Sequence, residues 1–139
     1  MSDATTILLV DGNTREREYY ADYLHAASAT YEVVQAASGG SGLDLCARQP
    51  MSCVVLEIDL PDMSGFEVLA RLVPRTYHPE IPVIVLTRLS NPFLLELAIK
   101  NGALGAFDKK RVSVDILGKT IRNAITTVHT LNSVSILAQ

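Results

Sequence analysis

The sequence predicts an α/β fold in which five helices cover a doubly wound, five-stranded parallel sheet. The first reason is a set of short apolar runs that end at polar residues, as in Cys53–Leu56 before Glu57; such runs are typical of parallel strands buried on both faces. The second is that segments with helical spacing separate these runs, which predicts right-handed crossovers. The third is size, because 139 residues with 48% hydrophobic content suffice for one core but not for two ordinary domains.

Five strands are expected, and most of them end beside a polar residue. We expect them at Thr5–Val10, Tyr31–Ala36, Cys53–Leu56, 81–86 and 105–107. In open α/β sheets, ligands bind at the carboxyl ends of the strands. The polar residues collected there are Asp11, Glu57, Asp59, Thr87 and Lys109. Each of them alone has an ordinary structural explanation, so it is their joint placement that predicts a functional site.

The first two helices are expected to follow the first two strands. One begins at Asn13, and its predicted inward residues are Tyr20, Tyr23, Leu24 and Ala27. Its charged residues are expected to form a solvated face: Arg15, Glu16, Arg17 and Glu18. The other follows Ser38 and ends before Pro50, with these residues directed inward: Leu43, Cys46 and Ala47.

Capping signals mark the third and fourth helices. Ser64 and Glu67 are spaced as a capping box at the start of a helix with Phe66, Leu69 and Val73 inward. The segment 74–80 is expected to be an exposed connection. Asn91 and Pro92 begin the next helix, Asn101 and Gly102 end it, and its inward residues are Leu94, Leu95 and Ala98.

The last helix is expected from about Ser113, with a heptad-like seam along it. The apolar positions of the seam are Val114, Leu117, Ile121, Ala124, Val128 and Leu131. A single domain explains the seam as far as Ile125. We therefore expect a domain over 1–125 and, over 126–139, either a slightly long last helix or a helix that pairs with a second subunit or leads to a further domain.

Composition limits the classes of partner and location. A net charge of -3 without a basic run offers no electrostatic footprint for nucleic acid or anionic membrane, so proteins are the expected partners. No apolar run approaches the ~20 residues of a membrane span, and the polar start MSDATT is unlike a signal peptide. We expect a cytoplasmic protein. Cys46 and Cys53 lack metal or redox spacing and are expected to be reduced packing residues.

Four separated stretches occur in the order found in one known family. They are LLVDGN, VVLEIDLPDMSG, IPVIVLT and NGALGAFDKK, and they lead into the last helix. Over about 7–125, the chain resembles a receiver domain of two-component response regulators. The resemblance implies a flavodoxin-like sheet with strand order 2-1-3-4-5. It also implies a signal-transduction module of a phosphorelay that is not an enzyme.

The resemblance implies roles for individual residues. In that family an acidic pair helps hold Mg²⁺, an aspartate accepts a phosphoryl group from histidine, and a hydroxyl residue and a lysine contact that phosphoryl. Carried over, Glu57 stands at the phosphoacceptor position, and Thr87 and Lys109 are the phosphoryl contacts. The implied metal residues are Asp11, Glu57 and Asp59, the last through its backbone carbonyl. We expect no cofactor beyond a weak or absent Mg²⁺ site.

The sequence departs from the family pattern at four positions around the phosphorylation machinery. Glu57 replaces the aspartate, Gly12 replaces one of the acidic pair, Lys110 replaces a cis proline, and Ala106 replaces an aromatic switch residue. Glutamate is longer by ~1.5 Å, and a misplacement of ~1 Å already costs ~100-fold in rate. Because a non-proline cis bond costs ~3 kcal/mol, we expect a trans bond before Lys110 and some displacement of Lys109.

These departures suggest a pseudo-receiver that does not depend on phosphorylation and acts through protein contacts. Glu57 is expected to pair with Lys109 as a built-in substitute for the phosphoryl group. A second interpretation is a decayed site in a module kept only for docking or dimerisation. A third is a receiver that is still phosphorylated on an unusual carboxylate, namely Glu57, Asp59 or Asp62.

The expected partner is a histidine kinase or an effector domain. The family's usual signalling face suggests the fourth and fifth helices as the contact surface, with Phe93 exposed after Pro92. The same pattern also predicts, as an alternative, a homodimer through the fourth and fifth helices or through the C-terminal helix.

Two other classes deserve comparison. The loop Asp11-Gly12-Asn13 faintly resembles the nucleophile loop of haloacid-dehalogenase phosphatases, but Asn13 replaces the second acid of that loop, so the proton donor for general acid catalysis is missing. A flavodoxin-like flavin domain needs a hydroxyl-rich phosphate loop after the first strand, which DGNTRE does not supply.

Overall fold

The protein is a five-stranded parallel sheet between two layers of helices. The computed structural model describes residues 5–73 and 81–137, with side chains described as far as residue 127. The strands are β1 (Thr5–Val10), β2 (Tyr31–Ala36), β3 (Cys53–Leu56), β4 (Val83–Thr87) and β5 (Gly105–Asp108). Their order is β2-β1-β3-β4-β5, and all neighbouring pairs are parallel. The predicted fold class and strand order are therefore confirmed.

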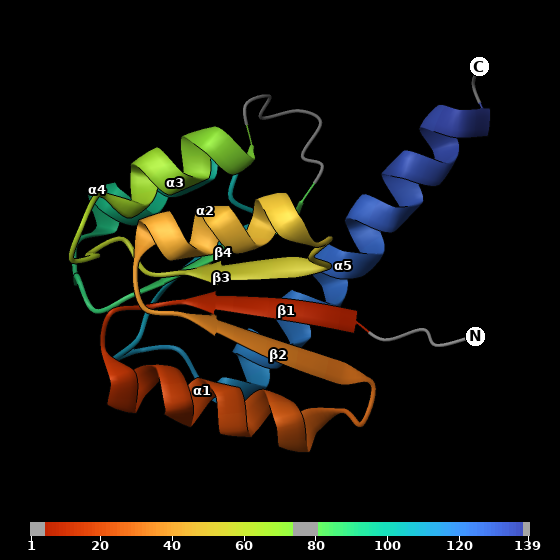
Figure 1. The fold of residues 1–139 in the computed structure, drawn as a ribbon. Helices are drawn as coiled ribbons and strands as arrows, with labels where there is room; N and C mark the ends of the chain where they lie inside the picture. The colour runs from red at the N-terminus through yellow and green to blue at the C-terminus, as the bar shows by residue number, and fades with distance from the viewer. Residues whose placement is uncertain (1–4, 74–80, 138–139) are drawn as a thin grey trace.

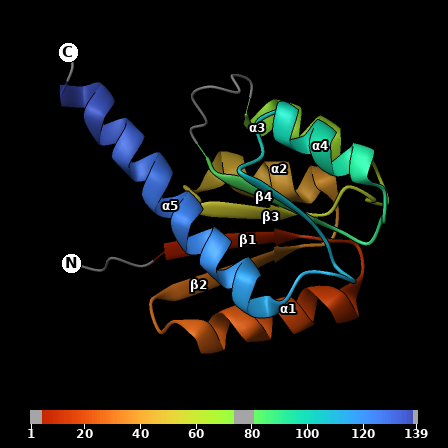
Figure 2. The same ribbon diagram turned by 180° about the vertical axis from the view of Figure 1, so that it is seen from behind.

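Helices cover both faces of this sheet. They are α1 (Thr14–Ala27), α2 (Gly39–Arg48), α3 (Gly65–Leu72), α4 (Pro92–Lys100) and α5 (Val114–Leu137). In Figure 1, α2, α3 and α4 lie on one side of the sheet, and Figure 2 shows α1 and α5 on the other side. None of the described helices is long and apolar enough to cross a bilayer.

The strands divide their side chains between two cores. Leu8 and Val10 of β1 belong to the core under α2, α3 and α4, whereas Ile7 and Leu9 belong to the core under α1 and α5. This alternation follows from the period of two in a strand, and burial on both sides explains the continuous apolar runs in the sequence.

Two inward positions predicted for helices are wrong, and one helix approaches the sheet more closely than expected. Ala27 and Ala47 are exposed, whereas Ala21 and Gly42 are buried. A Cβ atom at Gly42 would lie 2.9 Å from Val10 Cγ2, so α2 packs its glycine directly onto β1. This contact turns Ala47 toward solvent. Ala27 is the last residue of α1 and lies past the buried part of that helix.

The predicted capping box at Ser64 is only half formed. Ser64 Oγ accepts the Phe66 N–H at 3.1 Å, but Glu67 pairs with Arg71 on its own helix instead of reaching back. The full box occurs at α2, where Ser38 and Ser41 cap each other. The predicted caps Asn13 and Asn91 are confirmed, since each side chain accepts an N–H of the first turn.

The strand and helix ends differ slightly from the prediction. β4 begins at Val83 and includes Thr87, and β5 includes Asp108. The last helix begins one residue after Ser113 and continues without a break to Leu137, with its C-terminal part projecting past the sheet (Figures 1 and 2). Leu117, Ile121 and Ala124 of the seam are buried. The side chains of Val128 and Leu131, and the connection 74–80, lie outside what the structure describes.

Candidate functional site

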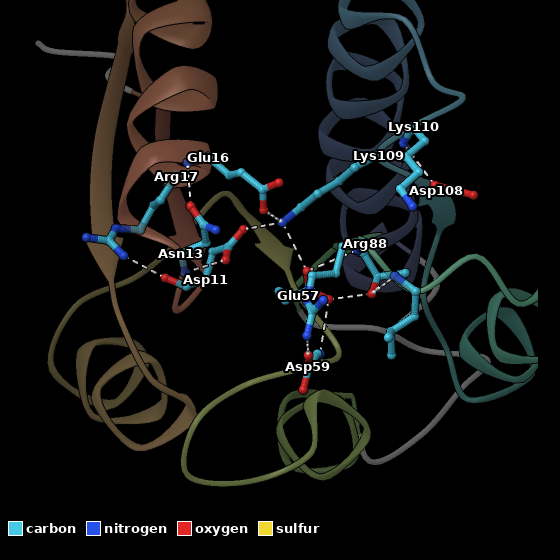
Figure 3. Close-up of polar contacts among 12 residues, drawn as sticks. Asp11, Asn13, Glu16, Arg17, Glu57, Asp59, Arg88, Asp108, Lys109 and Lys110 are labelled. Atoms are coloured by element: carbon cyan, nitrogen blue, oxygen red, sulfur yellow. Dashed lines mark hydrogen bonds and ion pairs between the residues drawn. The ribbon is translucent and has the colours of Figure 1, made fainter.

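Four of the five residues predicted to meet at the strand ends do meet there. Asp11 follows β1, Glu57 follows β3, Thr87 ends β4 and Lys109 follows β5. Their side chains are almost inaccessible, with exposed fractions of 10% for Asp11, 2% for Glu57 and 6% for Lys109, and Thr87 is fully buried. Figure 3 shows Asp11, Glu57 and Lys109 converging from separate elements. Every buried side-chain nitrogen or oxygen among the described residues has a hydrogen-bond partner.

Glu57 is the acceptor at the centre of the site. Its Oε1 accepts the Lys109 Nζ at 3.0 Å and the Arg88 N–H at 3.1 Å. Its Oε2 accepts the Asp59 N–H at 3.0 Å and a hydrogen bond from the Thr87 hydroxyl. A carboxylate has about four lone-pair positions, so these four donors saturate Glu57. The predicted Glu57–Lys109 pair is confirmed.

Lys109 is held by three carboxylates rather than one. Its Nζ lies 2.6 Å from Asp11 Oδ2, 2.7 Å from Glu16 Oε1 and 3.0 Å from Glu57 Oε1 (Figure 3). Burial by itself would lower the pKa of Lys109, but the hydrogen bonds to Asp11, Glu16 and Glu57 outweigh it and raise this pKa above its ordinary value. Lys109 is therefore protonated at neutral pH.

Two of the charged residues of α1 belong to the site, which corrects the prediction of a simple solvated face. Arg15 and Glu18 are exposed as expected, but Glu16 and Arg17 are half-buried. Asn13 Oδ1 accepts the Glu16 N–H at 2.9 Å, so the helix cap also places Glu16 beside Lys109. Arg17 donates to the Asp11 carbonyl at 2.6 Å and to Gln35 at 2.9 Å. No local sequence signal separates Glu16 from its charged neighbours, because its partner is distant in the chain.

Asp59 lies at the rim of the site. Its side chain remains 41% exposed and pairs with Arg88, a residue that the sequence did not single out. This ion pair, with the Arg88 N–H on Glu57, ties the loop after β4 to the loop after β3. Asp11, Gly12, Glu57 and Asp59 line an open hollow of about 340 Å³ next to the buried groups.

Asp62 has a structural role away from these groups. Its two carboxylate oxygens accept the N–H groups of Gly39 and Gly40, both at 2.8 Å, at the start of α2. The Gly40 and Gly39 hydrogen bonds lower the pKa of Asp62 below its ordinary value. Asp62 therefore holds α2 against the loop after β3.

The other departures from the family pattern are visible on β5 and after it. Ala106 is half-buried and carries no ring. The described residues contain no cis peptide bond, so the bond before Lys110 is trans, as expected. Lys110 is exposed, and its N–H donates to Asp108 Oδ1 at 2.8 Å. Cys53 is fully buried, and burial raises the pKa of its thiol to about 12, while Cys46 is half-buried; both are free thiols.

Sequence comparisons give one consistent result. The model of the response regulator receiver domain family matches residues 7–122. A probable cyclic di-GMP phosphodiesterase of Vibrio cholerae is 34% identical over 112 residues, which are 81% of this chain but only 24% of that protein. The polar-differentiation response regulator DivK of Brucella ovis is 28% identical over 118 residues, which are 85% of this chain and 94% of DivK. The chain thus spans about a quarter of the first relative and nearly all of the second.

Solved structures agree with the sequence comparisons. NtrX from Brucella abortus, crystallised with ADP, matches with a TM-score of 0.84 and 26% identity over 96% of this chain and 30% of NtrX. A receiver domain from Clostridium thermocellum matches with a TM-score of 0.80 and 26% identity over 91% of this chain and 98% of that one. A CheY-like receiver domain from Methanospirillum hungatei shares the fold with a TM-score of 0.80, at 24% identity and over 92% of this chain and 98% of that one.

Proposed function

Because the chain belongs to the response regulator receiver domain family, a family of two-component signalling modules, we propose that it is a receiver that keeps one signalling state without phosphorylation. The observation that carries this proposal is the hydrogen bonding of Glu57. A single carboxylate engages the Thr87 hydroxyl, the Lys109 ammonium and the Arg88 N–H. Thr87 and Lys109 are the residues that the family pattern assigns to the phosphoryl group, so Glu57 is a built-in anion in its place.

The geometry of Glu57 also argues against its acting as a phosphoacceptor. Each of its two carboxylate oxygens accepts two hydrogen bonds from the protein, and the side chain is 2% exposed. An attacking carboxylate oxygen needs a free lone pair directed at the phosphorus atom. Phosphorylation of Glu57 would therefore require the Lys109, Thr87 or backbone contacts to break first.

The neighbouring carboxylates are poor substitutes as acceptors. Asp59 is directed to Arg88, and Asp62 holds two N–H groups of α2, so neither contacts Thr87 or Lys109 among the described contacts. A phosphoryl group on either side chain would lack the hydroxyl and ammonium that stabilise its charge. The interpretation of phosphorylation on an unusual carboxylate is therefore not favoured.

Magnesium, which the family pattern implies, does not fit this set of residues. Mg²⁺ needs oxygen ligands with free lone pairs in near-octahedral geometry. Glu57 has no such lone pair left, Gly12 offers no carboxylate, and the two Asp11 oxygens already accept from the Asn13 N–H and from Lys109. Within the described part of the chain, no group of three His, Cys, Asp or Glu residues is arranged to hold a metal ion.

A protein is the proposed partner of this module, with α4 as part of the contact surface. Phe93 is 79% exposed and Leu97, one turn later, is 44% exposed, so both add apolar area to the outer side of α4. The Arg88 backbone joins this helix to Glu57 through the short loop after β4. A histidine kinase or an effector domain, or a second copy of this chain, would thereby sense the state of Glu57.

The Glu57→Gln variant tests the proposal, because it removes the negative charge and keeps the length of the side chain. We expect changes of the amide resonances to extend from Thr87 and Arg88 into α4, as far as Phe93 and Leu97. The physical reason is that an amide group cannot accept from all four donors of Glu57. Two-dimensional ¹H–¹⁵N spectra of the two proteins provide the measurement.

The matched control is Glu67→Gln, which removes a charge from an exposed residue of α3 that pairs with Arg71 on the surface. Its effects should stay near α3. Changes in Glu57→Gln that stop at the direct contacts of position 57 would contradict a signalling state set by Glu57. They would favour a module kept only for docking.

A further inference from the structure

We propose that Asp108 is the positioning residue of Lys109: its carboxylate holds the peptide after Lys109, so that the Lys109 ammonium stays within reach of Glu57. The inference rests on the proposed function and deepens it, because Glu57 can stand in for a phosphoryl group only while Lys109 contacts it. Nothing in the sequence pattern singles out Asp108, which ends β5 one residue before Lys109.

The peptide bond between Lys109 and Lys110 is trans and carries an N–H group, which a bond to proline would lack. Lysine also leaves φ of residue 110 free to vary, whereas a proline ring would fix it. The turn after β5 therefore needs another source of rigidity if the Lys109 side chain is to stay directed into the site.

Asp108 supplies this rigidity with its side chain and with its backbone carbonyl. Its Oδ1 accepts the Lys110 N–H at 2.8 Å, which forms an Asx turn (Figure 3). Its carbonyl accepts the N–H groups of Arg111 and Val112, both at 3.0 Å. Asp108 therefore holds the three N–H groups that follow Lys109 in the chain.

Lys109 is thereby fixed on both sides. Its own N–H donates to the Thr87 carbonyl at 2.8 Å, beside the last pair of the β4–β5 ladder. Asp108 is buried, and the hydrogen bond from the Lys110 N–H lowers the pKa of its carboxyl below the ordinary value, so this group is ionised at neutral pH. An alanine at position 108 would keep the backbone contacts but remove the acceptor of the Lys110 N–H.

The role of Asp108 is exerted through the backbone rather than through its charge. Among the described contacts, no hydrogen bond or ion pair joins the Asp108 carboxylate to the Lys109 ammonium, whose carboxylate partners are Asp11, Glu16 and Glu57. Arg111 Nε lies 3.9 Å from Asp108 Oδ2, and the Arg111 side chain is 84% exposed. A neutral acceptor at position 108 should therefore serve almost as well as the carboxylate.

The test measures how fast the ammonium protons of Lys109 exchange with water, in ¹H–¹⁵N spectra recorded for lysine side chains. The chain has four lysines, of which Lys100, Lys110 and Lys119 are exposed, whereas the Lys109 side chain is 6% exposed. Wild type should therefore give one slowly exchanging ammonium signal. Its absence from Lys109→Met assigns it.

Asp108→Ala should raise the exchange rate of the Lys109 ammonium at least about tenfold, as expected for loss of a hydrogen bond to a charged group. Asp108→Asn removes the charge but keeps an acceptor oxygen in the same place, so its rate should remain close to that of wild type. Ser38→Ala is the matched control, because it removes a cap hydrogen bond from α2. This control should leave the rate unchanged.

Three results would overturn the inference: an unchanged rate in Asp108→Ala, a rate in Asp108→Asn as fast as in Asp108→Ala, or an equal increase in Ser38→Ala. If Asp108→Ala folds poorly, the Lys110 amide of wild type provides a second measurement. That amide should exchange slowly with deuterium oxide although Lys110 is exposed, because Asp108 accepts its hydrogen bond. Rapid exchange of this amide would equally contradict the inference.

The same spectra separate this inference from the proposed function. A wild-type Lys109 ammonium that exchanges as fast as those of the exposed lysines would refute the pairing of Glu57 with Lys109, and both proposals with it. A protected Lys109 ammonium that Asp108→Ala leaves unchanged would refute the role of Asp108 alone. The spectra of Glu57→Gln would then still test the signalling state.

Discussion

Replacing Lys109 with methionine in metal-free buffer is expected to lower the free energy of unfolding by about 3–5 kcal/mol, the range for removing one partner of a buried ion pair. The variant leaves Asp11 and Glu57 buried without their shared cation, and Glu16 next to them. Methionine fills much of the space of the lysine stem, so the loss is mainly electrostatic. Urea denaturation at neutral pH with a chelator present provides the measurement.

The sign of the pH dependence follows from the raised pKa of Lys109, which its three carboxylate partners cause against the effect of burial. A raised pKa in the folded state means that the lysine contributes fully below its unfolded pKa of about 10.4. That contribution is lost only as the pH rises through the higher folded pKa. The difference between wild type and Lys109→Met should therefore stay constant from neutral pH up to about pH 9.

Lys110→Met is the control for this loss of stability. Lys110 is exposed and its side chain takes no part in the network, so its replacement should change the free energy of unfolding by no more than about 0.5 kcal/mol. Equal losses for the two variants would contradict the central place of Lys109. They would show that the net charge of the protein, rather than the buried contacts of Lys109, determines the loss of stability.

Glu57→Ala is expected to destabilise the fold by about 2–4 kcal/mol, because each buried polar group left without a partner costs roughly 1–3 kcal/mol and water relieves part of this. The substitution removes the acceptor of the Thr87 hydroxyl and of the Asp59 and Arg88 N–H groups. Lys109 retains two carboxylates, so its charge stays compensated. Chemical denaturation again measures the effect.

Glu67→Ala is the matched control for Glu57→Ala, since it shortens a glutamate whose partner Arg71 is on the surface. An exposed pair contributes about 0–1 kcal/mol, so its loss should be small. A Glu57→Ala variant as stable as Glu67→Ala would mean that the four contacts of Glu57 contribute little. The picture of Glu57 as the anchor of a fixed state would then fail.

Much of the fold is visible in the sequence because parallel strands buried on both faces leave unbroken apolar runs. The runs before Asp11 and Glu57 and the caps at Asn13 and Asn91 are local signals, and the structure confirms them. Errors such as Ala47 arise where close packing decides the orientation of a helix, because Gly42 rests on β1. No local pattern reports such a contact.

The candidate site was predictable as a set of strand ends but not as a network. Glu57, Thr87 and Lys109 could be grouped, since parallel strands end at one edge of the sheet. Glu16 and Arg88 could not, because each meets its partner across a large separation in the chain: Glu16 is 93 residues from Lys109, and Arg88 is 29 residues from Asp59. Surface charges of this kind are indistinguishable from solvated ones until the tertiary structure places them.

The most direct test of a phosphorylation-independent receiver is the intact mass of the purified protein after incubation with acetyl phosphate and Mg²⁺. We expect no mass gain in wild type, because Glu57 is saturated by donors from its own chain. Glu57→Asp is measured beside it, and a gain in this variant alone would show that Glu57 is what blocks the reaction. A phosphoryl-sized gain in wild type would contradict the proposal.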